Sequence, residues 1–331
     1  MCKKMPTFIN FGAIQRATRV EILKVFGIML VISLVLMLIL SLILKSFYEC
    51  EGAFGDTVHL DLRDHPNYDR LYNGKCIEEY HGEEDHKFPF IARFVVVNDT
   101  EKFVFCSGSL ISDDIVVTAA HCLAGITYAK LEVHVGTASN IEKFINFTEK
   151  DIKIHSKYDS KKFTNDIALI RLNRKFDPST ISTLCIPFDD EIIRKNLTMG
   201  EWDVEKIRIN DPKIIETTVN GIDNLKCGEY FHNLVEVVQQ TAPSNEISEL
   251  NKKLVNKNNQ KEVRFEQFCT EKKSVTPGNS GMPVYGNDLK TGAPTIYGFV
   301  SFGVKKEFGE DLPTVLTRIY DYRHWILCHS Y

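Results

Sequence analysis

An uninterrupted apolar run near the start of the chain restricts how the chain can fold more than any other feature of the sequence. Residues 25–44 read VFGIMLVISLVLMLILSLIL, twenty residues without a charge. A helix of that length rises about 30 Å, which matches the hydrocarbon thickness of a bilayer. We therefore expect a transmembrane signal-anchor helix. The alternative is a cleaved signal peptide and a secreted protein, but such peptides have apolar cores of only ~7–15 residues.

The flanking charges predict the orientation of this helix. Residues 1–24 carry five basic side chains against one acidic side chain, whereas Glu49, Glu51 and Asp56 follow the run. The positive-inside rule then makes residues 1–24 a cytoplasmic tail and places the rest outside the cell or in a lumen. The whole chain carries a formal net charge of −4, so the exterior part is acidic and does not favour a nucleic-acid partner.

Cysteines and glycosylation motifs agree with an exterior location. Cys2 lies in the predicted tail, and an even set lies outside, as is typical of an oxidising compartment: Cys50, Cys76, Cys106, Cys122, Cys185, Cys227, Cys269 and Cys328. N-x-Ser/Thr motifs predict glycosylation at Asn98, Asn146 and Asn196.

Short β-type segments dominate the chain from about residue 90 onward. FIARFVVV (90–97), DIALIRL (166–172) and TIYGFVSFG (295–303) are rich in β-branched and aromatic residues and are bounded by turn formers. Many short strands without intervening helices predict antiparallel barrels or a sandwich. Residues 188–265 have a more polar, Lys- and Asn-rich texture, and the final YDYRHWIL predicts a closing helix.

Two polar residues lie at the ends of apolar strands. His121 follows the strand and small residues of VVTAAHC, and Asp166 opens DIALIRL. A carboxylate that enters an apolar strand is costly unless it has a partner, and an imidazole whose tautomer it holds is such a partner. Taken singly, the histidine also suits a structural role and the aspartate a strand cap.

A third polar residue, Ser280, lies in PGNSGMP (277–283). A hydroxyl is a weak nucleophile until a base takes its proton. Gly278 would let the backbone N–H groups of Gly278 and Ser280 converge on one point, as in an oxyanion hole. Met282 occupies the last position of a would-be G-x-S-x-G motif, which disfavours an α/β-hydrolase elbow.

The order of these motifs resembles the chymotrypsin/trypsin-like serine proteases. TAAHC, DIALI and GNSGMP are similar to that family's three catalytic motifs, and Asp166 follows His121 by the usual 45 residues. VSFG (300–303) resembles its substrate-binding strand, with Phe302 in place of tryptophan, and PTVLTRIYDYRHWI resembles its C-terminal segment. The resemblance covers residues 71–331 apart from about 188–265.

The resemblance implies a fold and an activity. The fold would be two six-stranded antiparallel β-barrels with a C-terminal helix, in residues 71–331, after a stem or propeptide over residues 45–70. His121 would be the general base, Asp166 its orienting partner and Ser280 the nucleophile of a serine endopeptidase that hydrolyses extracellular proteins. Protein or peptide substrates and protein inhibitors are the partners that it implies, with neither a cofactor nor a metal.

It also implies substrate contacts. Ser301 and Gly303 would bind the substrate backbone, and Ser274 and Thr314 would line the specificity pocket. With serine in place of the aspartate of trypsin-like members, we expect that pocket to accept small or medium apolar residues.

Disulfides follow from the same resemblance. Cys106–Cys122 would lie beside the histidine, and closing a loop of that size contributes ~3 kcal/mol in the chain-entropy model. Cys185 would tie the domain to Cys50 or Cys76.

Departures from the family keep a second interpretation open. Arg70–Leu71 resembles an activation junction, but Asn279 replaces the aspartate that pairs with the new amino terminus in zymogen-type members. Activity is therefore predicted to depend little on the Leu71 amine, because some branches that read G-N-S-G are active. Met282 replaces a usual glycine. The alternative is a catalytically weak or inactive homologue that acts as an extracellular binding module.

Overall fold

The computed structural model describes residues 24, 26–41, 62–72, 89–97, 102–137, 140–176, 181–188, 195–202, 214–230, 263–271, 278–303 and 313–330. The chain divides into two compact units, Met1–Asp56 and Thr57–Tyr331. Cys50, Cys76, Asn98 and Ser274, which carry predictions made above, lie outside the described residues, as do residues 1–23 of the predicted cytoplasmic tail and both ends of the predicted membrane helix.

The first unit contains a helix over residues 26–41, whose side chains are exposed. Within the described residues, no helix combines the length and the apolar character that crossing a membrane requires. The signal-anchor helix stays a prediction.

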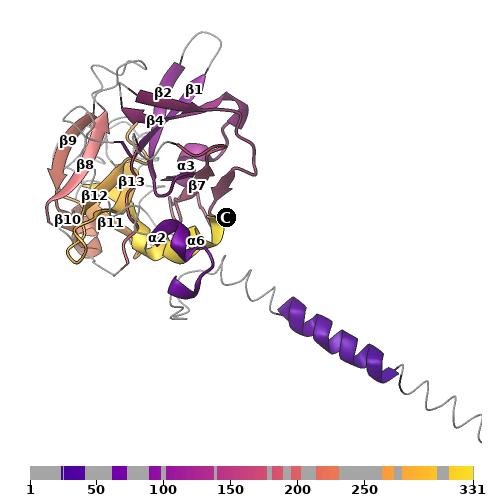
Figure 1. Ribbon diagram of the computed structural model, residues 1–331. Coiled ribbons are helices and arrows are strands. Elements are labelled where there is room, and N and C mark those ends of the chain that lie inside the picture. Colours follow the sequence, from indigo (N-terminus) through magenta and orange to yellow (C-terminus); the bar gives the residue numbers. More distant parts are fainter. Residues whose placement is uncertain are drawn as a thin grey trace, which may run out of the picture. The chain divides into compact units, whose positions relative to one another are not determined.

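The second unit is built on two antiparallel sheets (Figure 1). The first sheet has the order β5-β4-β1-β2-β3-β7-β6. Its strands are β1 (Ile91–Val97), β2 (Lys102–Leu110), β3 (Ile115–Thr118), β4 (Leu131–Thr137), β5 (Asn140–Phe144), β6 (Ile152–Ile154) and β7 (Ala168–Arg171). β1 pairs with both β2 and β4, and its first five residues, Arg93 among them, are buried.

The second sheet has the order β10-β11-β14-β13-β12-β8-β9. Its strands are β8 (Leu197–Trp202), β9 (Ile214–Val219), β10 (Gly221–Ile222), β11 (Gln267–Thr270), β12 (Pro283–Asn287), β13 (Pro294–Gly303) and β14 (Thr314–Arg318). β8, β9 and β10 fall in the polar stretch that sequence patterning had left unassigned.

Each sheet has seven described strands, so the prediction of six per barrel is wrong in number. The extra strands arise where one stretch of chain changes partners. Residues 140–154 contribute β5 to β4 and β6 to β7, on either side of a turn at Thr148–Asp151. Likewise β9 pairs with β8 and β10 with β11, with Asn220 between them. A pattern of apolar residues does not reveal such a change of partner.

Short helices complete the second unit. α3 (Ala120–Leu123) follows β3, and η3 (Tyr128–Lys130) precedes β4. The predicted closing helix is confirmed: η6 (Ile319–Tyr322) runs into α6 (Arg323–His329), which buries Trp325, Ile326 and Leu327.

The stem packs against this C-terminal helix. α2 (Tyr68–Tyr72), which follows η1 (Leu62–Asp64), lies beside α6 (Figure 1). Asn67 donates a side-chain hydrogen bond to the Leu327 carbonyl at 2.8 Å, and the His65 and His324 rings meet edge to face. Part of the predicted stem is therefore in direct contact with the protease-like domain.

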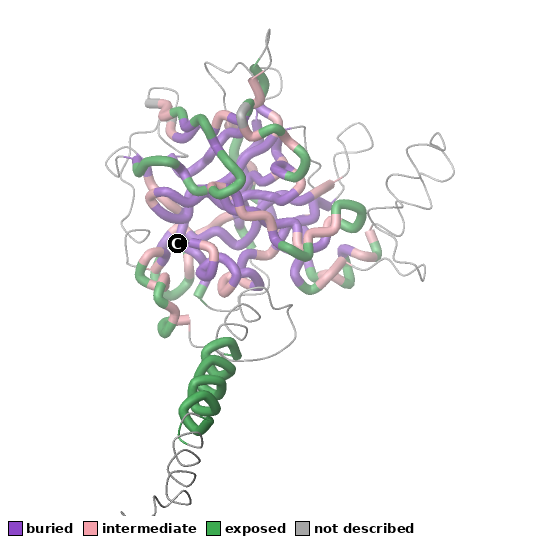
Figure 2. The backbone as a smooth tube through the Cα atoms, turned by 90° about the vertical axis from the view of Figure 1, so that its right-hand side faces the viewer, coloured by how far each residue is buried: buried purple, intermediate pink, exposed green. Residues whose placement is uncertain are grey.

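Most buried residues belong to the second unit, as the purple trace in Figure 2 shows. One core cluster includes residues of both sheets, for example Phe94 and Phe299, so the two sheets share an apolar interior. The two described glycosylation motifs lie at the surface: Asn146 and Asn196 are exposed and adopt left-handed backbone angles in turns.

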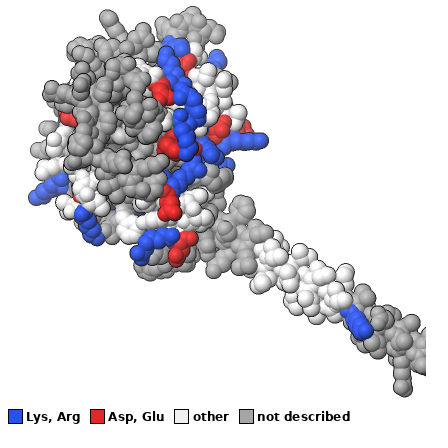
Figure 3. Space-filling view, in the orientation of Figure 1, with Lys and Arg blue, Asp and Glu red and all other residues white. Residues whose placement is uncertain are grey.

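Charged side chains on the domain surface are interleaved by sign. Figure 3 shows a band of Lys and Arg with acidic groups between them. Ion pairs in the second unit include Lys102 with Glu132 at 2.6 Å and Lys175 with Asp113 at 2.5 Å.

Candidate active site

The small residues before His121 allow the chain to turn sharply out of β3. Ala119 and Ala120 are fully buried, and His121 lies in the single helical turn α3 with its ring half-buried. The backbone N–H of His121 donates to Asp166 Oδ1 at 2.9 Å, and the ring Nδ1 lies 2.8 Å from Asp166 Oδ2. Because a carboxylate only accepts, this contact places the ring proton on Nδ1 and leaves Nε2 free to accept a proton.

Asp166 is 1% exposed and compensates for its burial with hydrogen bonds. Besides the two donors from His121, the Ser301 hydroxyl donates to Oδ2 at 2.5 Å. Ser301 was predicted only as a substrate contact, so this second role was missed. A serine in a strand has many uses, and only the tertiary fold brings Ser301 next to Asp166.

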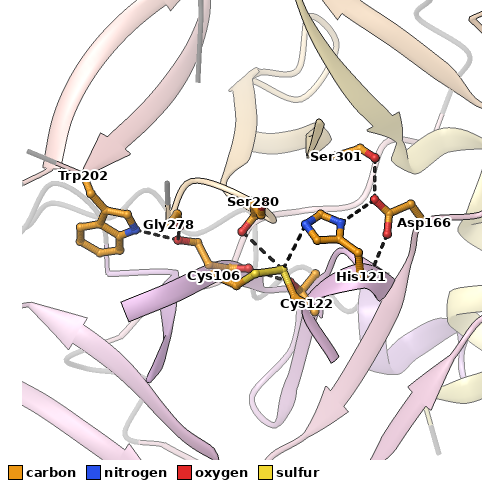
Figure 4. The surroundings of a disulfide bond; sticks show 10 residues. Cys106, His121, Cys122, Asp166, Trp202, Gly278, Ser280 and Ser301 are labelled. Atoms are coloured by element: carbon orange, nitrogen blue, oxygen red, sulfur yellow. Dashed lines mark hydrogen bonds and ion pairs between the residues drawn. A yellow bond between two sulfur atoms is a disulfide. The ribbon is translucent and has the colours of Figure 1, made fainter. Parts of the chain in front are cut away.

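The nucleophile turn contains two glycines with left-handed backbone angles. Gly278 has φ +91° and Gly281 has φ +80°. A Cβ atom on Gly281 would overlap the Ser107 carbonyl oxygen, so this position accepts only glycine at the observed backbone geometry. The turn presents Ser280 half-exposed, on the same side as the His121 ring (Figure 4).

Three consecutive carbonyls of the turn, those of Gly278, Asn279 and Ser280, accept hydrogen bonds. Ser107 N–H donates to Ser280 O at 2.7 Å, Ser107 Oγ donates to Gly278 O at 3.0 Å, and Met282 N–H donates to Asn279 O at 2.9 Å. In contrast, the N–H groups of Gly278 and Ser280 donate to no other described residue. Two unused N–H donors beside a serine are what an oxyanion hole requires.

Ser280 and His121 are neighbours without a direct hydrogen bond between their side chains in the described structure. The Cys122 sulfur lies 3.8 Å from His121 Nε2 and 3.8 Å from the Ser280 carbonyl oxygen (Figure 4). Catalytic hydrogen bonds often form or tighten only once substrate is bound, so catalysis does not require a Ser280–His121 hydrogen bond in the substrate-free chain. Cys106, His121 and Cys122 also have the proximity of metal ligands, but the disulfide uses both sulfurs.

The two residues of the turn that depart from the family pattern, Asn279 and Met282, are both buried. Asn279 is 1% exposed, and its Oδ1 accepts the Trp202 backbone N–H at 3.0 Å. Met282 is fully buried in the shared core, with its sulfur packed close to Gly200. The Met282 side chain therefore lies in the core rather than on the exposed side of the nucleophile turn.

Two aromatic rings near His121, those of Phe163 and Phe302, form a feature that was not predicted from the sequence. The Phe163 ring lies 5.4 Å from the His121 ring and 5.5 Å from the Phe302 ring. Phe163 has φ +54°, which is strained for a residue with a large side chain, and Gln267 donates to its carbonyl at 3.0 Å. No short sequence pattern announces such a residue, because its conformation depends on the loop.

The predicted substrate-binding strand is β13. Its pairing with β14 shifts between Val300 and Phe302, which leaves Ser301 at a bulge without an opposite residue. Gly303 pairs directly with Thr314, and Thr314 is fully buried at the start of β14. These positions stay predictions as substrate contacts.

The disulfides extend what was predicted. Cys106–Cys122 is present, and Cys227–Cys269, which was not predicted, joins the 224–230 helix to β11. Cys185 and Cys328 are also disulfide-bonded, to partners outside the described residues.

The predicted junction Arg70–Leu71 lies inside α2. Both Arg70 N–H···O contacts to Asp114 are short, at 2.5 and 2.6 Å, and Leu71 is only 2% exposed. In this conformation, the peptide bond is part of a packed helix rather than an exposed loop, so a protease could reach it only after local unfolding.

Two antiparallel sheets with a shared core, a buried Asp–His pair and a Gly-Asn-Ser-Gly turn define the chymotrypsin-like class of proteins. The trypsin family profile matches residues 77–326. The chain therefore belongs to the trypsin family.

Individual relatives support this assignment. "Chymotrypsin" of Phaedon cochleariae is 26% identical over 270 residues, 77% of this chain and 83% of that protein. "Trypsin Blo t 3" of Blomia tropicalis is 27% identical over 231 residues, 67% of this chain and 76% of that protein. "Trypsin" of Sarcophaga bullata is 43% identical, but the match spans only 68 residues, 20% of this chain and 27% of that protein.

Proposed function

We propose that this chain is a serine endopeptidase that hydrolyses peptide bonds through an acyl-enzyme on Ser280. Family membership supports a peptidase in general terms. The observation that carries the specific proposal is the Asp166–His121 pair, with its 2.8 Å contact, beside a turn in which the Gly278 and Ser280 N–H groups donate to no other described residue.

The reaction follows from this geometry. His121 Nε2 takes the Ser280 hydroxyl proton as Oγ forms a bond to the substrate carbonyl carbon. The Gly278 and Ser280 N–H groups stabilise the resulting oxyanion, and Asp166 stabilises the imidazolium. The C–N bond then breaks, with the imidazolium proton passing to the leaving amine. In the second half of the reaction, His121 takes a proton from water as the water oxygen attacks the acyl carbon. The bond to Ser280 Oγ then breaks, and the proton passes to Oγ.

We propose that the substrates are proteins or peptides outside the cell, presented to a domain anchored by residues 25–44. This part of the proposal rests on the apolar run, the flanking charges and the exterior cysteines. Secretion after signal cleavage is the alternative. Beside the histidine, Phe163 and Phe302 offer an apolar surface, which agrees with the expected preference for apolar side chains.

The competing function is a binding module without turnover. The lack of a Ser280–His121 hydrogen bond among the described residues favours it. A fluorophosphonate probe on the purified full-length chain separates the two. We expect labelling of the wild type and none of Ser280→Ala. An unlabelled wild type that folds normally would contradict the proposed enzyme and favour the binding module.

We also propose that activity does not require cleavage at Arg70–Leu71. Asn279 has no charge to attract a new amino terminus, and Arg70 already pairs with Asp114. Arg70→Gln removes the cleavage site and the ion pair, whereas Asp114→Asn breaks the same pair and keeps the site. We expect equal labelling of both variants. Labelling that is lost only in Arg70→Gln would show that cleavage is needed.

A further inference from the structure

A hydrogen-bonded chain runs from the second sheet through the first sheet to the nucleophile turn. Trp202, the last residue of β8, donates its indole Nε1–H to Ser107 Oγ of β2 at 2.8 Å. Ser107 Oγ in turn donates to the Gly278 carbonyl at 3.0 Å. Figure 4 labels Trp202 and Gly278, the two ends of this chain of contacts.

The same two residues hold the turn at two other points. The Trp202 backbone N–H donates to Asn279 Oδ1 at 3.0 Å, and the Ser107 N–H donates to Ser280 O at 2.7 Å. Trp202 is 3% exposed and Ser107 is fully buried, so water does not compete readily for these bonds. The indole also packs on the turn, since a Cβ on Gly278 would lie 3.4 Å from Trp202 Cδ1.

We propose that Trp202 and Ser107 are positioning residues, a clamp that holds the oxyanion turn in its working shape in the uncleaved chain. This inference rests on the proposed function. Gly278 and Gly281 give the turn backbone freedom, so its peptide planes need external partners. Ser107 binds the carbonyls of Gly278 and Ser280, while the N–H groups of Gly278 and Ser280 have no partner among the described residues.

The clamp performs a task that a charged amino terminus would otherwise perform. Asn279 is buried and neutral, and it accepts a backbone N–H that exists before any cleavage. A neutral anchor made of backbone and indole donors avoids the cost of burying an ammonium beside an uncharged amide. The turn is thus ordered by folding alone.

Variants separate the clamp from general stability. Trp202→Phe deletes the indole N–H but keeps the backbone donor to Asn279, and Ser107→Ala deletes the hydroxyl link. Trp325→Phe is the matched control, because the buried Trp325 Nε1 has no hydrogen-bond partner among the described residues. Each variant is made in the full-length chain and checked for its melting temperature.

The first readout is the rate of fluorophosphonate labelling. We expect the saturating rate to fall about 10-fold in Trp202→Phe and Ser107→Ala, with little change in the reagent concentration for half-saturation. Trp325→Phe should label as the wild type does. Wild-type saturating rates in both clamp variants would overturn the inference even if their melting temperatures fall.

The second readout does not depend on activity. The chain has two tryptophans, so an indole-¹⁵N-labelled protein gives two N–H signals, and Trp202→Phe assigns them. Ser107→Ala should shift the Trp202 signal and leave the Trp325 signal in place. An unmoved Trp202 signal would overturn the clamp. If the wild type is not labelled by the probe, the proposed enzyme fails, and the indole signals still decide whether the clamp exists.

Discussion

Gly281→Ala tests whether the nucleophile turn requires the backbone geometry seen here. At φ +80° an alanine costs about 1–2 kcal/mol from its left-handed conformation. Its Cβ would also overlap the Ser107 carbonyl and lie 2.5 Å from Thr118 Oγ1, and relieving such a clash typically costs ~1–3 kcal/mol. We therefore expect a loss of about 2–5 kcal/mol of unfolding free energy.

Gly292→Ala is the matched control for this prediction. Gly292 has a similar φ, +72°, but nothing lies within 4 Å of an added Cβ. It should lose only the conformational part, about 1–2 kcal/mol. At ~2–4 °C per kcal/mol for a domain of this size, thermal unfolding followed by circular dichroism resolves the difference. The reasoning is refuted if Gly281→Ala melts no lower than Gly292→Ala.

Three further predictions concern the site and its support. Ser301→Ala removes the hydroxyl bond to Asp166, so probe labelling should slow about 10-fold at unchanged half-saturation; an unchanged rate would contradict its role. Met282→Ala leaves a cavity in the core and should lower the free energy of unfolding, measured with denaturant, by ~2–5 kcal/mol. The folded fraction should still be labelled at the wild-type rate, and slower labelling would show that Met282 contacts the site. Burial lowers the pKa of His134, an effect partly offset by Glu132 and reinforced by Arg93 and Lys143. The unfolded chain thus binds the proton more readily, and stability present above about pH 6.5 should fall as the pH drops below it. His134→Gln should flatten that fall, whereas an unchanged pH profile would contradict this assignment.

The environments of Asn279 and Met282 show why a motif departure is ambiguous in sequence alone. In the linear motif, both look like damage to a catalytic turn. In the folded chain, Asn279 accepts a backbone hydrogen bond from β8, and Met282 fills the core between the sheets. Neither substitution removes a donor or acceptor on which the proposed chemistry depends.

Short-range patterns in this chain were sufficient to predict the class of fold. Runs of β-branched and aromatic residues, turn formers and the C-terminal helix pattern depend on neighbours in the chain, and these predictions agree with the two antiparallel sheets and with α6. The motif order likewise predicted the residues of the candidate site, and the Cys106–Cys122 disulfide that it implied is present. The number of strands was wrong, because a change of sheet partner within residues 140–154 has no local signature.

The tertiary structure alone decided what surrounds those residues. Ser301 reaches Asp166 across 135 residues of sequence, Trp202 reaches Ser107 across 95, and Arg70 reaches Asp114 across 44. Each of these contacts joins side chains whose types suit many other roles. Residue type and spacing therefore indicated which groups could react, whereas the packing of the two sheets determined which groups position them.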